Sequence, residues 1–381
     1  MGVRMLLRSA SVSAVALGVL TTGIVSASAS YSSSPSPVRY SPNSTVFAVA
    51  VTADRVYIGG KFTRLTDLST GTVVSRSHLA AFDRQTGDLL PWAPVADADV
   101  RGLAVDPATG EVYAGGYFTS LSGASGPYVA GILPDGTVDT QWRPNPNKAV
   151  RSIVVDGSSI YLAGLFGSIG GVGRAGVARV NDTTGAADAA WAAKTVGGRP
   201  RVIALAANGQ DLMIGGSFTS INGAPRSFLG SVSLADGSVT GWTPPAICSD
   251  CDVFSLATNG DAVFAGVGGH PGGTAARYEY STGALDWSLH ADGNVQSIAY
   301  ADGTVYAGGH FGPSFARSNR HQIAAVSADQ GTLLPWNPVL GSPDYPGVWA
   351  LVATSDALFV GGAFTSVGGG APAKFAEFPT I

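Results

Sequence analysis

Short apolar runs alternate with polar turns along most of this chain. The runs consist of Val, Ile, Leu, Ala, Tyr and Phe, as in 78–83, 100–106 and 112–116, and Gly, Asp and Pro bound them. This composition is typical of β-strands joined by tight turns. After residue 40, no segment has the 3.6-residue periodicity of an amphipathic helix. The pattern therefore predicts an all-β protein.

Tryptophans recur at nearly constant intervals. Six of them are separated by 50, 49, 51, 45 and 49 residues: Trp92, Trp142, Trp191, Trp242, Trp287 and Trp336. A second marker, a β-branched or aromatic run ending in Gly, recurs seven times, at 56–60, 112–116, 161–164, 212–216, 263–266, 305–309 and 358–362. Such regularity indicates one structural unit copied in tandem.

Each unit contains four apolar runs, the last of which ends at Trp. Four strands in about 50 residues, repeated seven times, predict a seven-bladed β-propeller. The next Trp would be due near position 386, so the seventh unit lacks its fourth run. Tyr40-Ser-Pro-Asn43 lines up with Trp142-Arg-Pro-Asn145. We therefore expect residues 38–40 to supply the missing N-terminal strand and close the ring, with the propeller spanning 38–381.

Composition and charge narrow the functional classes. Glycine accounts for 52 of 381 residues and charged residues for only 13%, which suits tight turns and sheets buried on both faces. The net charge is −4, and no basic run with interleaved aromatic residues occurs. We therefore expect no nucleic-acid partner.

The first 29 residues have the features of a secretory signal peptide. Arg4 and Arg8 precede a largely apolar stretch from Val12 to Val25, and Ala27-Ser-Ala29 is a small-residue cleavage site. The alternative is an uncleaved anchor, but the apolar stretch is short for a bilayer span. We expect residues 30–37 to form a polar linker, and the mature protein to be extracellular, with no membrane insertion after cleavage.

The two cysteines, Cys248 and Cys251, lie in the loop after Trp242. In an extracellular protein, the expected state is a local disulfide that stiffens this loop. A redox role would require a thioredoxin-like βαβ setting, and a zinc site would require a second pair of ligands.

The repeat resembles known propeller families. The run 56–63, then 79–87, then Trp92 resembles a kelch-type blade, and the Gly-Gly-x-Phe-Thr-Ser form at 115–120, 215–220 and 361–366 is closer to the delta-60 repeats of secreted bacterial propellers. The resemblance covers the whole mature chain and implies a propeller that acts as a binding platform. Blades three, five and six depart from the pattern in the loop after Gly.

Function is expected where the repeats differ. When the first runs are aligned on their Val, the next residue varies through Phe47, Arg101, Arg151, Ile203, Phe254, Gln296 and Trp349, and the residue after that is always small. Aromatic, arginine and glutamine side chains at a channel mouth would suit a carbohydrate or an anionic ligand. We predict ligand binding by Phe47, Arg101, Arg151, Phe254, Gln296 and Trp349. The alternative is that these side chains plug the channel or pack between blades.

No catalytic or metal-binding motif is present. His270, His290, His310 and His321 are spaced by 20, 20 and 11 residues, which matches no compact metal site. The acid pairs Asp97/Asp99 and Asp250/Asp252 could serve glycoside hydrolysis or calcium ligation, but loop spacing alone determines neither. We expect no cofactor.

These features favour a secreted, non-enzymatic binding propeller. The leading hypothesis is recognition of cell-surface or cell-wall carbohydrate through one loop-rich face. A protein-interaction scaffold in a secreted complex is the alternative, and a glycan-cleaving hydrolase is a third possibility.

Overall fold

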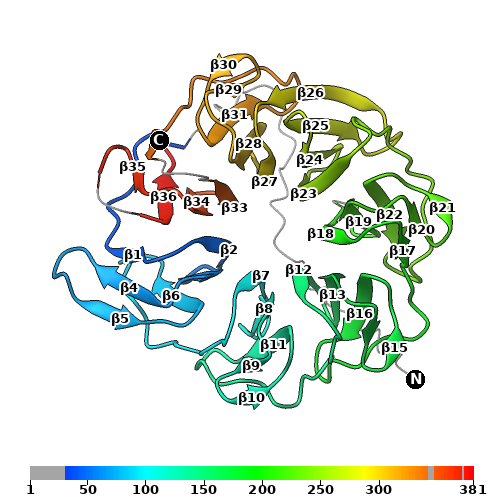
Figure 1. The fold of residues 1–381 in the computed structure, drawn as a ribbon, viewed down its shortest axis with the longest axis horizontal. Helices are drawn as coiled ribbons and strands as arrows, with labels where there is room; N and C mark the ends of the chain where they lie inside the picture. Colours follow the sequence, from blue (N-terminus) through cyan, green and yellow to red (C-terminus); the bar gives the residue numbers. More distant parts are fainter. Residues whose placement is uncertain (1–30, 207, 342–346, 371–372) are drawn as a thin grey trace, which may run out of the picture.

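The computed structural model describes residues 31–381 except 207, 342–346 and 371–372. In this part, the chain forms strands and turns and no helix, so no helix there is long and apolar enough to span a bilayer. Seven antiparallel sheets stand around a central axis as the blades of a β-propeller (Figure 1). The expected signal peptide at 1–29 lies outside the described residues.

The first strand of each blade lies innermost (Figure 1). Each inner strand contacts the inner strand of the next blade, and that of blade seven contacts that of blade one. The inner strands therefore form a closed ring around a channel. They are β2 (Val46–Val51), β7 (Val100–Val105), β12 (Val150–Asp156), β18 (Pro200–Leu205), β23 (Cys251–Thr258), β27 (Val295–Ala301) and β33 (Val348–Ala353).

Second and third strands follow outward in antiparallel order. The second strands are β3 (Arg55–Gly60), β8 (Val112–Gly116), β13 (Ser159–Gly164), β19 (Asp211–Gly216), β24 (Ala262–Gly269), β28 (Thr304–Gly309) and β34 (Ala357–Gly362). The third strands are β6 (Leu79–Asp83), β11 (Val129–Ile132), β16 (Val177–Asn181), β22 (Leu229–Ser233), β25 (Gly273–Glu279), β31 (Ile323–Ser327) and β36 (Phe375–Pro379).

The fourth strand is much reduced in most blades. Blade five has a complete one, β26 (Leu285–Ala291), paired with β25. In five other blades, a single bridge joins the third strand to the residues before Trp, at Phe82–Leu89, Ile132–Val138, Val180–Ala187, Val232–Val239 and Val326–Leu333. The expected four-run unit is therefore present, but its fourth run is mostly irregular.

Short strands form a peripheral layer outside the blades (Figure 1). Most are hairpins in the loop between second and third strands, and some also pair with the loop that follows Trp. They are β1 (Tyr40–Pro42), β4 (Arg64–Asp67), β5 (Val73–Ser75), β9 (Ser120–Leu121), β10 (Ala124–Ser125), β14 (Ser168–Ile169), β15 (Val172–Gly173), β17 (Thr195–Val196), β20 (Ser220–Ile221), β21 (Ala224–Pro225), β29 (Ser314–Phe315), β30 (Ser318–Asn319), β32 (Leu340–Gly341) and β35 (Ser366–Val367).

Where a second strand ends in Gly-Gly, as β8 does at Gly115 and Gly116, close packing leaves no room for a side chain at either position. A Cβ on Gly115 would lie 2.9 Å from Cγ1 of Val150, which begins the inner strand of the next blade. A Cβ on Gly116 would lie 2.1 Å from the carbonyl oxygen of Asp99 in its own blade. Gly115 thus leaves room for the neighbouring blade, and Gly116 leaves room for the inner strand of its own blade.

Each of the six repeated tryptophans connects two blades. The indole N–H of Trp142 donates to the carbonyl of Asn181 at 3.0 Å, and that of Trp191 donates to the carbonyl of Ser233 at 3.1 Å. In both cases the acceptor ends the third strand of the following blade. The Trp rhythm of the sequence therefore reflects a repeated contact between blades.

Ring closure occurs earlier in the chain than predicted. The N–H groups of Ser32 and Ser36 donate to the carbonyls of Pro379 and Glu377 at 2.7 and 2.8 Å, so residues 31–36 run alongside β36 as its outer neighbour. Closure by an N-terminal segment occurs as expected, but residues 31–36 of the expected linker pair with β36 in place of residues 38–40. Tyr40 pairs with Asp67 in the periphery of blade one.

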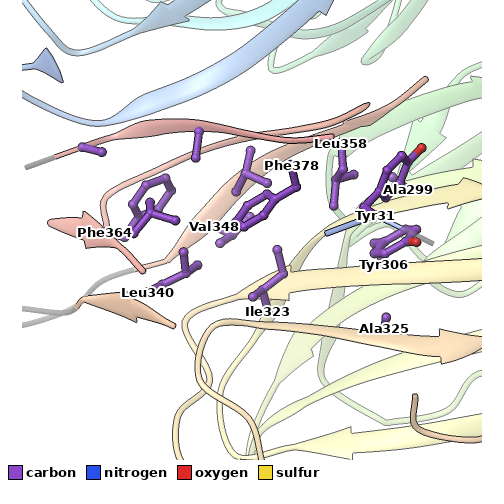
Figure 2. Close-up of a cluster of buried hydrophobic side chains, with 14 residues drawn as sticks. Tyr31, Ala299, Tyr306, Ile323, Ala325, Leu340, Val348, Leu358, Phe364 and Phe378 are labelled. Atoms are coloured by element: carbon purple, nitrogen blue, oxygen red, sulfur yellow. The ribbon is translucent and has the colours of Figure 1, made fainter. Parts of the chain in front are cut away.

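Tyr31 anchors this closing segment. Its side chain is 1% exposed and packs against Tyr306 of blade six, with 5.1 Å between the ring centres. Figure 2 shows it among the apolar side chains between blades six and seven, which include Leu358 and Phe378. Trp336 donates to the carbonyl of Ser32 at 3.0 Å. The closing segment thus occupies the place of the missing fourth strand.

Candidate functional site

A β-bulge at or near the start of every inner strand positions one side chain toward the channel mouth. In β7, the register shifts between Val100 and Gly102, and Arg101 is the extra residue. The same shift occurs in the other six blades. A bulge inserts one unpaired residue and redirects its side chain. The channel mouth is therefore built by the same backbone device in all seven blades.

Seven bulge residues line one cavity of about 180 Å³. They are Phe47, Arg101, Arg151, Arg201, Phe254, Gln296 and Trp349. The structure brings together all six residues that the sequence singled out as ligand-binding candidates. We call this group the mouth ring.

Arg201 was missed, and Ile203 does not occupy the corresponding position. The alignment used Val202 as the first residue of the strand, but the bulge in β18 lies between Pro200 and Val202. Pro200 thus takes the place that Val holds in the other blades. Ile203 is 4% exposed and belongs to the apolar core between blades three and four. Allowing Pro at the first position would have identified Arg201.

Below the mouth ring, small side chains allow the inner strands to approach one another. A Cβ on Gly102 would lie 2.6 Å from the carbonyl oxygen of Arg151. Ser255 accepts a hydrogen bond from the N–H of Ile298 at 2.9 Å, and so ties blades five and six. A second cavity of about 160 Å³ at this level shares Arg151 and Trp349 with the mouth ring. The channel therefore continues inward from the mouth.

Two arginines of the mouth ring are held in place by a carboxylate and an aromatic ring. Arg101 donates to Asp99 at 2.9 Å, and its guanidinium lies 3.6 Å from the centre of the Phe47 ring. Arg201 forms an ion pair with Asp252, and its guanidinium lies 4.6 Å from the centre of the Phe254 ring. These contacts orient both side chains and neutralise much of their charge.

Arg151 lies between these two and is bound differently. It donates to the hydroxyl of Tyr117 at 2.8 Å, and it makes no ion pair within the described residues. Burial raises the pKa of Asp252, whereas the charges of Arg201 and Arg151 act in the opposite direction. Arg151 is therefore the arginine of the mouth ring whose charge no described carboxylate pairs with directly.

Two aromatic residues of the mouth ring contact each other. Trp349 and Phe47, on blades seven and one, meet edge to face with 5.5 Å between their ring centres. Arg101, Arg151 and Arg201 come from blades two to four. The arginines thus lie on three consecutive blades, Phe47 and Phe254 stack on two of these arginines, and Trp349 lies on blade seven across the ring from blades three and four.

Three polar atoms at the mouth have no hydrogen-bond partner among the described residues. They are Oε1 of Gln296, Oδ1 of Asp252 and Nε of Arg101. Gln296 is only 6% exposed. A buried polar atom without a partner is costly, so these atoms mark positions where a ligand or water would be stabilised.

The loop acids considered for catalysis have structural partners in most cases. Asp97 accepts hydrogen bonds from the N–H and hydroxyl of Thr119 at 2.8 and 2.7 Å. Asp99 and Asp252 pair with mouth-ring arginines. These contacts orient loops and guanidinium groups.

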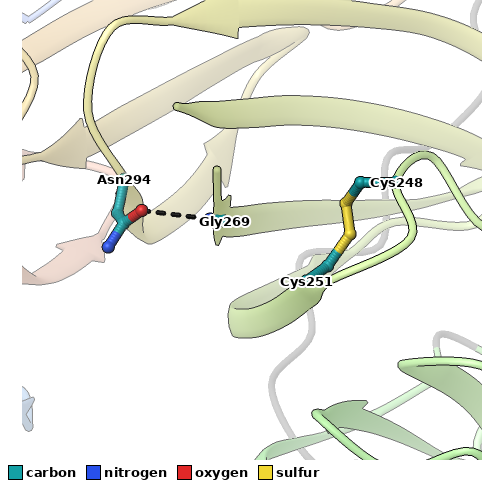
Figure 3. Close-up of a disulfide and its surroundings, with 4 residues drawn as sticks. All are labelled: Cys248, Cys251, Gly269 and Asn294. Atoms are coloured by element: carbon teal, nitrogen blue, oxygen red, sulfur yellow. Dashed lines mark hydrogen bonds between the residues drawn. A yellow bond between two sulfur atoms is a disulfide. The ribbon is translucent and has the colours of Figure 1, made fainter. Parts of the chain in front are cut away.

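The two cysteines pair with each other, and the described residues form no metal-binding cluster. Cys248 and Cys251 are joined by a disulfide with 5.8 Å between their Cα atoms, in the loop that leads into β23 (Figure 3). Within the described part of the chain, no three His, Cys, Asp or Glu residues are grouped closely enough to hold a metal ion. The four histidines of blades five and six belong to this part of the chain.

Comparisons with known proteins support the fold. The model of a family described as a domain of unknown function, DUF5122 β-propeller, matches residues 108–141, which span most of one repeat. The chain resembles the crystal structure of the WD40 β-propeller domain of Doa1, with a TM-score of 0.60 and 12% identity over 92% of this chain and 97% of that one.

A second similar structure is a designed protein. The crystal structure of the computationally designed Ika8 protein matches with a TM-score of 0.54 and 12% identity over 89% of this chain and 97% of that one. No curated protein sequence matches. At such low identity, both structural likenesses show the propeller fold alone.

Proposed function

We propose that this chain is an extracellular, non-enzymatic binding protein that recognises carbohydrate at the mouth ring. The observation that carries the proposal is the seven-residue cavity, in which aromatic faces, guanidinium groups and unpartnered polar atoms converge. Sugars present apolar C–H faces that stack on aromatic rings and hydroxyls that bond to polar groups. Extracellular location rests on the signal-like leader at 1–29.

The proposal does not extend to glycan cleavage. Glycoside hydrolysis requires one carboxylic acid to protonate the leaving group and a second to act as base or nucleophile. Asp99 and Asp252, the acids nearest the mouth ring, each pair with an arginine. Their contacts therefore support a role in positioning guanidinium groups.

Binding of a protein partner is the second candidate function. Exposed apolar residues on the loops that follow Trp favour this candidate. Val95, Val196 and Val339 lie on loops that follow Trp and are 52%, 48% and 66% exposed. Protein interfaces use exposed apolar side chains of this kind. These residues lie outside the mouth ring, so the two candidates make separable predictions.

The test is binding of the purified protein to an array of bacterial, fungal and plant glycans, with Trp349→Ala and Val95→Ala compared with wild type. We expect Trp349→Ala to reduce binding at least tenfold, because the stacking surface is lost, and Val95→Ala to bind normally. Absence of glycan binding by the wild type would overturn the carbohydrate proposal. A partner captured by wild type and lost in Val95→Ala would instead support the protein candidate.

A further inference from the structure

Resting on the proposed function, we infer that the recognised sugar carries a carboxylate and that Arg151 binds this group. The first observation is the charge of the mouth ring. Three arginines line the cavity, and Asp99 and Asp252 pair with two of them. These three arginines and two carboxylates together carry a formal charge of +1, and Arg151 is the arginine without an ion-pair partner. A ligand with one negative charge would neutralise it.

Arg151 has the right geometry to receive a planar carboxylate. A guanidinium carries five N–H donors in a fixed fork, and Tyr117 accepts one of them in Arg151. Arg101 and Arg201 are turned toward Asp99 and Asp252 and stack on Phe47 and Phe254. Two parallel N–H donors remain available on Arg151 for bidentate binding.

Two unpartnered acceptor atoms at the mouth would be stabilised by donors from the same ligand. Oε1 of Gln296 and Oδ1 of Asp252 accept hydrogen bonds but have no donor among the described residues. A simple inorganic anion has no donors to offer them, and a neutral sugar offers hydroxyls but leaves Arg151 without an anion. A sugar acid supplies both the carboxylate and the hydroxyls.

The position of Trp349 in the ring completes the match. Trp349, on blade seven, lies across the ring from Arg151 and Arg201 on blades three and four, and its neighbour Phe47 is stacked by Arg101. An apolar sugar face against Trp349 would direct the substituents of the sugar toward Arg151 and Gln296. A doubly charged phosphate would exceed the single positive charge and face the two carboxylates.

The experiment compares matched sugars by NMR titration. The acids are the methyl glycosides of glucuronate, galacturonate and N-acetylneuraminate, and the neutral counterparts are methyl glucoside, methyl galactoside and the methyl ester of the third. Galactose 6-sulfate tests a sulfate ester. The proteins are wild type, Arg151→Gln and the charge-matched control Arg64→Gln, whose side chain is exposed on β4.

We expect at least one acid to bind wild type roughly tenfold more tightly than its neutral counterpart, because a charge-assisted bidentate contact is added. Arg151→Gln should remove this preference with its melting temperature unchanged, and Arg64→Gln should keep it. Equal binding of acid and neutral sugar, a preference that survives Arg151→Gln, or stronger binding of the sulfate ester would overturn the inference but leave carbohydrate binding intact. Absence of binding by every sugar would overturn both.

Discussion

At the channel mouth, single residues determine what a ligand meets, while the backbone around them is constant. The same bulge holds arginine in blades two to four, phenylalanine in blades one and five, and glutamine and tryptophan in blades six and seven. Because a bulge residue is unpaired in the ladder, its side chain can change without altering the strands. The side chains at these seven positions therefore determine the chemistry offered to a ligand, while the backbone around them stays the same.

Glu111 is a buried acid whose ionisation should affect stability. It is 8% exposed, and burial, together with the charge of Asp139, raises its pKa to about 7, whereas a hydrogen bond from Tyr113 opposes this change. Its folded pKa exceeds the unfolded value, so the folded state binds more protons between pH 4.5 and 7. The free energy of unfolding therefore falls as pH rises through this interval, by about 2–3 kcal/mol from this group.

Glu111→Gln should remove that contribution. Chemical denaturation at pH 4.5 and pH 8 should show a gain in stability of the variant relative to wild type that is about 2 kcal/mol larger at pH 8. Asp329→Asn, at an exposed turn position, controls for the loss of one negative charge. A stability difference between Glu111→Gln and wild type that stays constant with pH would contradict the assignment.

At the scale of elements, packing between blades determines which residues the second strand can hold. Gly59, Gly115, Gly215, Gly308 and Gly361 each leave room for the Val that begins, or nearly begins, the inner strand of the next blade. The same packing occurs where blade seven meets blade one: a Cβ on Gly361 would lie 2.7 Å from Cγ1 of Val46. The Gly-Gly motif of the sequence is therefore a packing requirement between neighbouring blades.

Gly115→Ala should be destabilising for this reason. Its Cβ would lie 2.9 Å from Cγ1 of Val150 and 3.1 Å from the carbonyl oxygen of the same residue, so β8 or β12 would have to move. We expect a loss of about 1–3 kcal/mol in the free energy of unfolding, measured with urea. Gly126→Ala is the control, because its nearest contact would be 3.8 Å away. Equal stability of the two variants would contradict the packing argument.

For the molecule as a whole, closure of the ring depends on contacts between the two ends of the described chain. Residues 31–36 pair with β36, and Tyr31 also donates to the carbonyl of Thr354 at 2.5 Å. This pairing covers the outer edge of blade seven, which would otherwise be an unpaired strand edge. The stability of the ring therefore rests on a segment far from β36 in sequence.

Deletion of residues 31–36 should lower the melting temperature of the whole propeller and promote aggregation. The deletion removes the buried Tyr31 ring and exposes the edge of β36. Tyr31→Ala alone should cost about 3–5 kcal/mol, as for other large buried aromatics. Ser33→Ala, at an exposed position of the same segment, should leave the melting temperature unchanged. Unaltered melting of the deletion variant would show that another segment closes the ring.

The sequence by itself determined the all-β class, the tandem repeat and six of the seven mouth-ring residues. Each follows from a local or periodic constraint: apolar runs bounded by turn residues, tryptophans and glycines that contact the next blade, and variable positions at a constant place in the repeat. Arg201 was not predicted from the sequence, because Pro200 replaces the Val on which the repeats were aligned.

The tertiary structure alone decided which segment closes the ring and how the mouth arginines are partnered. Residues 31–36 are mostly Ser and Pro, so their strand pairing depends on the available edge of β36 and carries no apolar alternation of its own. Asp252 reaches Arg201 from the next blade, 51 residues away in sequence. Such contacts depend on how blades meet in space, because ring geometry brings together residues that no local pattern links.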